Sequence, residues 1–365
     1  MKTSAAVLVL LSALTFVASS SAGSSQDSAG PDGGSPSGNH MTLNVSVFYP
    51  LSMSKNDRVS TNINLSWLYG KVGAVDGVDL SGWVSQVGRD AHGLQATGIV
   101  GLVANNMQGF QAAGVYNYVG STVEGAQAAG VYNRAGGDVS LVQAAGIINT
   151  VGGDFEGIQA AGVVNVLRGK LTGLQASTVN LAGDVDGVQV CVVNTAGRVR
   201  GFQVGVVNIA RSIDGIPIGL VNYAEEGTVH PVVWGSNMML TNLGAKFAVN
   251  EHFYSVFSVG HNNQSEDVGT SLALGYAMGV HLPVQSDVYV DIDLGGLSID
   301  NDELFRADKG VKNQSMLQAR LTVGYELVDK LSIFGGIGQN YVLDHDEAFS
   351  DGDYRTQLLA GLQLL

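Results

Sequence analysis

The sequence predicts an all-β protein in which a β-solenoid, with coils of about 14–16 residues, is inserted into an eight-stranded antiparallel β-barrel. Three observations lead to this fold. Of the 365 residues, 50 are Gly and only 14% are charged, which disfavours long charged helices and favours short strands joined by turns. Glutamine and asparagine recur at a regular spacing through the middle of the chain. Longer stretches in which apolar and polar residues alternate follow them.

The N-terminal segment, 1–40, predicts export followed by a disordered leader. Met1 and Lys2 precede an apolar run, 5–18, which is too short to span a membrane, and Ser20, Ser21 and Ala22 are small enough for signal-peptidase cleavage. We therefore expect residues 1–22 to be a signal peptide. Residues 23–40 are rich in Gly, Ser, Pro and Asp and cannot bury a core, so we expect them to be disordered.

Residues 60–232 contain an internal repeat with the unit Gly-Φ-Gln-Ala-Ala-Gly-Val-Φ-Asn, where Φ is an apolar residue, as in residues 125–133. Glutamine recurs at every sixteenth position up to Gln175 and at every fourteenth position from there on; Asp79 extends the series upstream and Pro217 downstream. The glutamines are Gln95, Gln111, Gln127, Gln143, Gln159, Gln175, Gln189 and Gln203. The asparagines are Asn117, Asn133, Asn149, Asn165, Asn180, Asn194, Asn208 and Asn222.

This period fits one coil of a β-solenoid, because helical repeats and propeller blades need more than about 30 residues. Coils stacked in register bring identical side chains about 4.8 Å apart, so the amides are expected to form structural ladders. The shortening at Gln175 then indicates a narrower coil. Two alternatives stay open at this point: antiparallel hairpins in one long sheet, and a repetitive ligand-binding face made by the Gln and Asn columns.

A second architecture is expected from segments in which apolar residues occupy every second position. One face of each segment is apolar, and the other is small, polar or charged. The eight expected strands are 41–50, 236–248, 253–262, 270–282, 287–298, 315–327, 330–342 and 355–365. Their lengths suit a tilted membrane strand, and eight is the smallest common outer-membrane barrel. The predicted barrel domain is therefore 41–50 together with 236–365.

The lengths of the connections predict how this barrel is oriented. Short connections alternate with long polar ones, which matches the short periplasmic turns and long outer loops of outer-membrane barrels. If 41–50 is the first strand and rises from the periplasm, the repeat emerges outside the cell. The expected lumen residues are Asp287, Asp291, Asp293, Arg320 and Glu326, because small and ionised side chains suit a tight interior. The alternative is a soluble β-sandwich or barrel with the large residues inside.

The repeat, the leading strand that ends in Val47-Phe48-Tyr49-Pro50 and the barrel-like C-terminal third resemble a bacterial family of surface repeat-containing envelope proteins. The resemblance covers roughly residues 41–365. It implies a location at the cell surface, but no agreed activity and no functional residue. The shorter coils after Gln175 and Pro217 depart from the pattern.

The composition and motifs also limit the function. A net charge of −14 with 18 Lys and Arg residues disfavours nucleic-acid binding, and a single cysteine, Cys191, allows no intrachain disulfide. No hydrolase, metalloprotease or nucleotide-binding motif appears, so we expect no enzyme and no cofactor or metal. The expected function is a surface protein of the outer membrane, in contact with its lipid, whose exposed repeat is displayed for adhesion to cells, glycan or matrix. The alternatives are a structural envelope component without a ligand and a lipid-modifying barrel enzyme using His261 or Asp291.

Overall fold

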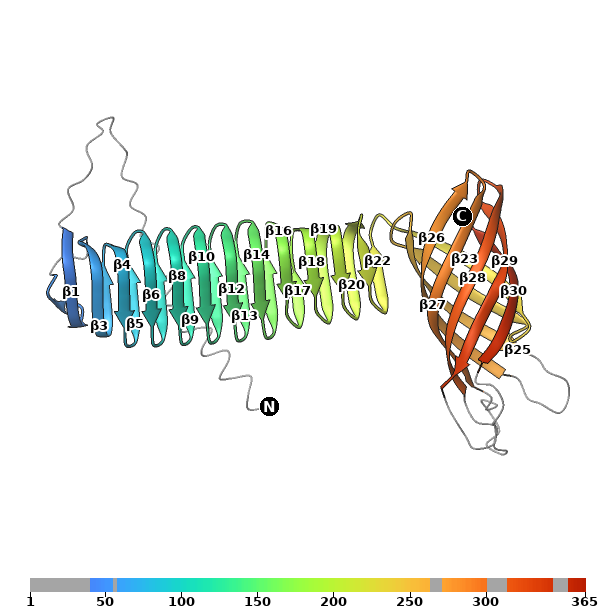
Figure 1. Cartoon of the computed structure of the whole chain (residues 1–365), viewed down its shortest axis with the longest axis horizontal. Helices are drawn as coiled ribbons and strands as arrows, with labels where there is room; N and C mark the ends of the chain where they lie inside the picture. The colour runs from blue at the N-terminus through green and yellow to red at the C-terminus, as the bar shows by residue number, and fades with distance from the viewer. Residues whose placement is uncertain (1–39, 55–57, 263–270, 301–313, 344–353) are drawn as a thin grey trace. The chain divides into compact units, whose positions relative to one another are not determined.

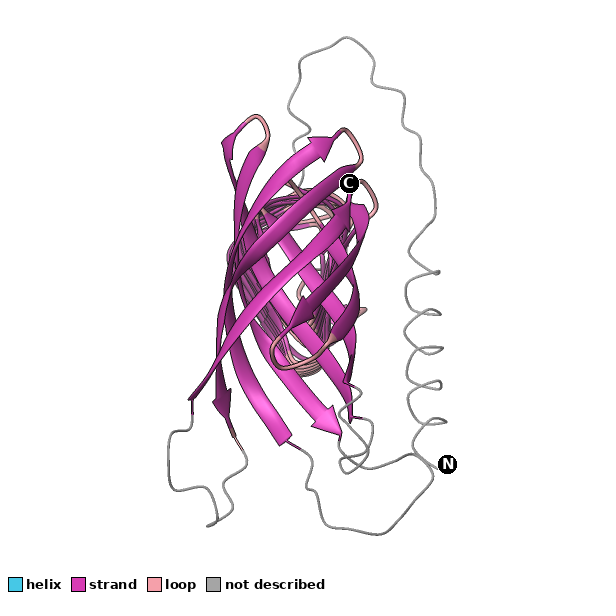
Figure 2. Ribbon diagram, turned by 90° about the vertical axis from the view of Figure 1, so that its right-hand side faces the viewer, coloured by secondary structure: helices cyan, strands magenta, loops and turns pink. Residues whose placement is uncertain are grey.

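The computed structural model describes residues 40–54, 58–262, 271–300, 314–343 and 354–365 (Figure 1). Every described element is a strand or a loop (Figure 2). The expected signal peptide, the leader apart from His40, and most of each long connection of the barrel lie outside the described residues. The fold class is confirmed: a stacked parallel β-solenoid and a closed eight-stranded antiparallel barrel.

The solenoid contains 22 strands in a single sheet system. Those before the shortening at Gln175 are β1 (His40–Phe48), β2 (Leu51–Ser52), β3 (Ser60–Val72), β4 (Ala74–Ser81), β5 (Val84–Val87), β6 (Ala91–Thr97), β7 (Val100–Val103), β8 (Met107–Ala113), β9 (Tyr116–Val119), β10 (Val123–Ala129), β11 (Tyr132–Ala135), β12 (Val139–Ala145), β13 (Ile148–Val151), β14 (Phe155–Ala161), β15 (Val164–Leu167) and β16 (Lys170–Ala176). The narrower coils follow as β17 (Val179–Leu181), β18 (Asp184–Val190), β19 (Val193–Val204), β20 (Val207–Ile213), β21 (Ile216–Ile218) and β22 (Val221–Ala224).

Each coil lays one longer strand and one shorter strand on those of the previous coil, always in parallel. Gln127 of β10 pairs with Gln111 of β8 on one side and with Gln143 of β12 on the other. The parallel register removes the alternative of antiparallel hairpins. The pairing of Gln175 with Gln189 shows that the columns continue without interruption where the coils become narrower.

A column of glycines lets the coils approach closely. Gly93, Gly109 and Gly125 have φ between 104° and 141°, and a Cβ on Gly109 would lie 2.2 Å from the carbonyl oxygen of Gly93. Only glycine adopts this conformation without strain. Leu141 takes the same position in one coil, with φ of 86°.

The barrel consists of β23 (Thr228–Ser236), β24 (Thr241–Ala248), β25 (Phe253–Asn262), β26 (Ser271–Gln285), β27 (Val288–Asp300), β28 (Gln314–Val328), β29 (Leu331–Val342) and β30 (Tyr354–Leu364). It closes where β23 pairs with β30, as in Val233 opposite Leu362. The eight strands confirm the predicted number, and seven of them match predicted ones.

The predicted first strand of the barrel, 41–50, is wrong. β1 belongs to the solenoid, where it pairs in parallel with β3, and the first barrel strand is β23, of which residues 228–232 were predicted to lie in the repeat domain 60–232. The barrel is therefore one continuous segment, and the solenoid precedes it instead of being inserted into it. The prediction failed because Asn44 and Ser46 face the polar solenoid interior while Leu43 and Val45 face outward, which is the alternation of a membrane strand.

This correction changes the end of the barrel to which the solenoid is attached. Thr228, the first residue of β23, pairs with Ala248, the last residue of β24, just before the short connection to β25. Asn250 in that connection donates to the carbonyl oxygens of Ile213 and Gly215 in the last coils. The short connections between β26 and β27 and between β28 and β29 lie at the same end. The solenoid is therefore connected to the barrel at the end where the short turns lie. This overturns the strand topology from which an extracellular repeat was predicted.

Candidate functional site

Two buried polar systems are candidates for a functional site: the side-chain ladders of the solenoid and the charged interior of the barrel. The predicted Gln and Asn residues all lie in the solenoid interior, and all but Asn222 are fully buried. Each Gln from Gln111 to Gln203 donates its Nε2 to the Oε1 of the preceding glutamine, at 2.7–2.9 Å. Buried amides satisfied in this way stabilise the stack and leave no amide edge for a ligand. The predicted structural ladders are thus present.

The two ladders have opposite polarity. The glutamine amides donate toward the N-terminal coils, whereas each Asn from Asn117 to Asn208 donates its Nδ2 to the Oδ1 of the following asparagine, at 2.8–3.3 Å. The side-chain dipoles of the two columns therefore oppose each other along the stack.

Asp79 ends the glutamine ladder at its N-terminal side. Gln95 donates to Oδ2 of Asp79 from one side, and Asn64 donates to its Oδ1 from the other, at 2.9 and 2.8 Å. Ser85 adds a third donor. An ionised carboxylate accepts from every direction, so it suits a point where two sets of donors meet. Burial raises the pKa of the Asp79 carboxyl, and the hydrogen bonds from Ser85, Gln95 and Asn64 oppose that rise.

At two other ladder ends a buried acceptor has no hydrogen-bond partner among the described residues. These atoms are Oδ1 of Asn117 and Oε1 of Gln203. Gly101 occupies the position that would supply a donor to Asn117, and Pro217 occupies the position that would supply one to Gln203. The ladders therefore stop where the sequence lacks the next amide.

The barrel interior holds charged side chains joined in pairs. Asp291 accepts from Lys246 Nζ and contacts His281 Nδ1, both at 2.6 Å. Asp293 accepts from Nε of Arg320 at 2.7 Å. The carboxylates and their cations are almost completely buried, with the half-buried His281 as the exception.

Three of the five predicted lumen residues are confirmed, namely Asp291, Asp293 and Arg320. Asp287 is exposed because it lies in the short turn between β26 and β27, so its prediction as a lumen residue is wrong. Glu326 is half-buried near the short-turn end of β28. Lys246 is also buried in the barrel interior, although it was not predicted as a lumen residue. It lies in the predicted strand 236–248.

Aromatic rings, amides and two clusters of buried apolar side chains occupy the remaining interior. Lys246 lies 4.0 Å from the centre of the Tyr254 ring, and Gln318 donates to Asn340 and Gln357 at 2.8 and 2.7 Å. The cavity beside the Lys246 and Asp291 pair measures about 40 Å³, little more than one water molecule occupies. Among the described residues, side chains therefore occupy most of the barrel interior around this ion pair.

The outer surface of the barrel has the opposite character. On β28, Leu317, Leu321 and Val323 are 43–54% exposed, while Arg320 and Thr322 between them are buried. Leu274 on β26 is 60% exposed. At these positions large apolar side chains therefore point away from the barrel, and the charged side chains of the ion pairs point into it.

The other predicted features are placed as follows. Cys191 is half-buried in a solenoid turn, its Sγ lies 2.9 Å from Oδ1 of Asn194, and burial raises the pKa of its thiol. His261 lies on β25. Across the described ranges, no three His, Cys, Asp or Glu side chains gather as metal ligands. The part of the chain that the structure describes also has no helix long and apolar enough to cross a bilayer.

No protein-family model and no curated protein matches the chain. Among solved structures, it is similar to the N-terminal β-barrel domain of Pseudomonas aeruginosa OprF, with 11% identity and a TM-score of 0.29 over 38% of this chain and 99% of that one. Neisserial surface protein A has 16% identity and a TM-score of 0.26 over 37% and 92%. The Yersinia pestis outer membrane protein Ail has 11% identity and a TM-score of 0.26 over 38% and 99%.

Proposed function

We propose that this chain is an outer-membrane protein whose barrel anchors the solenoid to the membrane as a structural component of the cell envelope. The observation that carries the proposal is the distribution of side chains in the barrel: Leu274 and Leu321 are exposed on its outside, whereas Asp291 and Arg320 are buried inside. In water such a surface would be costly, because full burial of a Leu side chain provides about 1.5–3 kcal/mol and each partly exposed Leu forgoes a share of it. In a bilayer the same side chains contact hydrocarbon, and the closed barrel leaves no backbone group unpaired.

The proposed location of the solenoid is the periplasm. Outer-membrane barrels have short turns on the periplasmic side and longer loops outside. The solenoid precedes β23, whose first residue lies at the short-turn end. This favours the structural alternative over extracellular display, and it leaves the connections after β25, β27 and β29 as the parts that face outward.

The proposed role is mechanical and not catalytic. The ladders from Asp79 to Gln203 and from Asn117 to Asn222 tie successive coils together, so the stack behaves as a stiff rod. Its twelve coils span about 53 Å at about 4.8 Å per coil. Asp291, which the enzyme alternative would use, already accepts from Lys246 and contacts His281.

Labelling single cysteines in intact cells tests the location. The background is Cys191→Ser, because Ser177 occupies the same column in the previous coil and makes the same contact to an asparagine. Glu156→Cys places a thiol on an exposed charged column of the longer solenoid strands, which also holds Asp76 and Glu124. Arg355→Cys places one at the long-loop end of the barrel.

A maleimide that cannot cross the outer membrane is expected to label the Arg355→Cys chain in intact cells. It should label the Glu156→Cys chain only after the outer membrane is permeabilised. Labelling of Glu156→Cys in intact cells would mean that the solenoid is displayed outside, as the sequence predicted, and would overturn the periplasmic location. A full-length chain recovered from the soluble fraction would overturn the membrane anchorage itself.

A further inference from the structure

Part of the outer face of the longer solenoid strands carries no charge. Two outward columns lie on this face. The first runs from Leu43 through Phe110 to Ile216, and the second from Val45 through Ala128 to Ile218. Each column has twelve members, and all of them are Val, Leu, Ile, Phe or Ala. None is buried, so nothing in the described chain covers this face, which we call the apolar strip.

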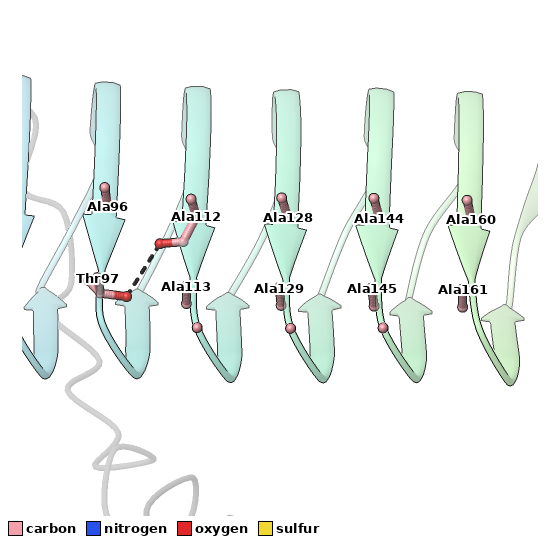
Figure 3. A pocket seen from close by; sticks show the side chains of 13 residues that line it. Ala96, Thr97, Ala112, Ala113, Ala128, Ala129, Ala144, Ala145, Ala160 and Ala161 are labelled. Carbon is pink, nitrogen blue, oxygen red and sulfur yellow. Dashed lines mark hydrogen bonds between the residues drawn. The ribbon is translucent and has the colours of Figure 1, made fainter.

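The two columns of the apolar strip differ in side-chain size, and this difference repeats in most coils. In the first column large side chains dominate, such as Phe110, Ile158 and Phe202, each 42–48% exposed. In the second column the six successive members from Ala96 to Ala176 are all alanine. The alanines line a shallow groove of about 640 Å³, and Figure 3 shows Ala96, Ala112, Ala128, Ala144 and Ala160 at the same height on successive strands. A ridge of large side chains thus runs beside a groove of small ones.

The size of the strip matches what a specific protein interface needs. At about 4.8 Å per coil it is about 53 Å long, and the ridge and groove together are roughly 12 Å wide. The face therefore offers roughly 600 Å², or roughly 1,200 Å² for two such faces, which is the lower bound for a stable interface. A monomer in water rarely leaves a contiguous apolar patch of this size uncovered.

We propose that the apolar strip packs against the apolar strip of a second copy of this chain. A twofold axis parallel to the stack reverses the order of the two columns, so the ridge of each copy lies over the alanine groove of the other. Two sheets pack in this way about 10 Å apart. The same axis leaves the two stacks parallel, so the barrels of both copies are attached at the same end of the paired solenoids. Two barrels in one membrane require this arrangement.

The leader expected at 23–40 does not offer a better occupant. Residues 23–39 contain no Val, Leu, Ile, Phe, Met, Tyr or Trp, so they cannot bury the ridge. The parallel direction of the two copies rests on the proposed membrane anchorage. The pairing of the two strips does not.

Cross-linking between full-length chains tests the pairing. Two populations are coexpressed with different tags in the Cys191→Ser background, one carrying Val142→Cys in the ridge and the other carrying Ala144→Cys in the groove. A bis-maleimide with a reach of about 10 Å matches the expected distance between the faces. The matched control is Arg134→Cys in both populations, because Arg134 is exposed on the shorter strand of its coil, outside the strip. We expect at least tenfold more cross-linked dimer from the ridge and groove pair than from the control.

Equal yields from the two pairs, or a monomer by light scattering in mild detergent, would overturn the pairing. So would copurified lipid bound along the strip of a monomer. Cross-linking of Ala128→Cys chains to Ala144→Cys chains, with no product from the ridge and groove pair, would mean that the two stacks are antiparallel. That result would contradict the parallel arrangement. It would not change the result of the cysteine labelling that tests the location.

A charge in the groove provides the second test. Ala128→Arg is expected to reduce dimer at a given concentration at least tenfold, while hydrogen exchange in the ladder strands stays as slow as in the unaltered chain. Glu156→Arg, on the exposed charged column outside the strip, should leave the dimer intact. A dimer that survives Ala128→Arg contradicts the proposal.

Discussion

Gln95 donates its side-chain amide to the buried carboxylate of Asp79, with 2.9 Å between Nε2 and Oδ2. Asn64 donates to the other carboxylate oxygen from the opposite side. Two series of amides that donate in opposite directions therefore meet at Asp79. One is the glutamine ladder, and the other is the short series in which Asn44 donates to Asn64 and Asn64 donates to Asp79. An amide side chain there would bring a donor to face a donor, so the stack needs an acceptor at this one position.

Replacing this carboxylate tests the meeting of the two ladders. Asp79→Asn is expected to destabilise the solenoid by about 1–3 kcal/mol at neutral pH, because one incoming amide loses its acceptor in a buried site. The measurement is urea unfolding of the full chain, read by a short pulse of hydrogen exchange in the solenoid peptides. Asp76→Asn makes the same change on the exposed side of β4 and should cost less than about 0.5 kcal/mol. Equal effects of the two substitutions would contradict this role of Asp79.

The pH dependence of stability gives a separate prediction for the same residue. Burial raises the pKa of Asp79 in the folded chain above the ordinary value of 3.8. Between these two values the folded state binds more protons than the unfolded state, so the stability falls as the pH rises through that window. Above the window the contribution is constant. In urea unfolding from pH 3.5 to 8, the stability difference between the unaltered chain and Asp79→Asn should therefore shrink as the pH rises, and a difference that grows would contradict the prediction.

The unpartnered acceptor on Gln203 predicts a stabilising substitution. Pro217→Gln adds the amide that every other coil from Gln95 onward has at this position, so it is expected to donate to Oε1 of Gln203. We expect a gain of about 1 kcal/mol, the net value of one buried hydrogen bond. The measurement is slower hydrogen exchange in β19 and β21. Faster exchange there would mean that Pro217 is needed for the geometry of the last coils.

Leu141 is a second site at which the structure predicts stabilisation. It has φ of 86° at a position where Gly125 and Gly157 lie in the neighbouring coils, and its side chain is 63% exposed. Leu141→Gly removes strain of about 1–2 kcal/mol and gives back part of it as backbone entropy, so we expect a net gain of up to about 1 kcal/mol. Thermal unfolding followed by circular dichroism measures it. A loss of more than about 1 kcal/mol would show that the exposed side chain has an apolar partner.

The ion pair in the barrel interior predicts a large effect of removing one partner. Asp291→Ala is expected to destabilise the barrel by about 3–5 kcal/mol because it leaves the buried Lys246 without its carboxylate. The folded fraction in urea is read from the heat-dependent mobility of the barrel on a gel. Asp287→Ala, in the exposed turn just before β27, is the matched control and should change little. Recovery of stability in the double variant Lys246→Met with Asp291→Leu would confirm that the cost comes from the unpaired charge.

The fold could be predicted from the sequence to the extent that period and spacing determine it. The regular spacing of Gln127 and Gln143 predicts the stack and its ladders, because only identical positions in stacked coils come within hydrogen-bond distance. The alternation on β28 predicts which side chains line the barrel. The direction of each ladder and the role of Asp79 could not be predicted, since they depend on which amide atom faces which neighbour.

The assignment of the first barrel strand failed for a physical reason. The part of each longer solenoid strand that holds the column of Asn44, Asn64 and the glutamines buries polar residues and exposes apolar ones, as β28 of the barrel does, so such a strand shows the alternation of a membrane strand. β1 therefore resembles a barrel strand in sequence, and only the pairing of Asn44 with Asn64 identifies it as part of the stack. β23 was not predicted because its inward residues Val232 and Trp234 are apolar, so its sequence lacks the alternation of apolar and polar residues. Because the side of the membrane was inferred from the parity of the strands, exchanging one strand for another removes the argument that placed the repeat outside the cell.

The proposed membrane anchorage requires that the apolar side of the barrel faces hydrocarbon. It is tested most directly by nitroxide labels at Leu321→Cys and Thr322→Cys, in the Cys191→Ser chain reconstituted into lipid vesicles. Leu321 is 43% exposed on the outside of β28 and Thr322 is 6% exposed on the inside. We expect dissolved oxygen, which concentrates in hydrocarbon, to relax the label at position 321 strongly and a water-soluble nickel chelate to leave it unaffected. Strong relaxation of that label by the nickel chelate would place this surface in water and contradict the account.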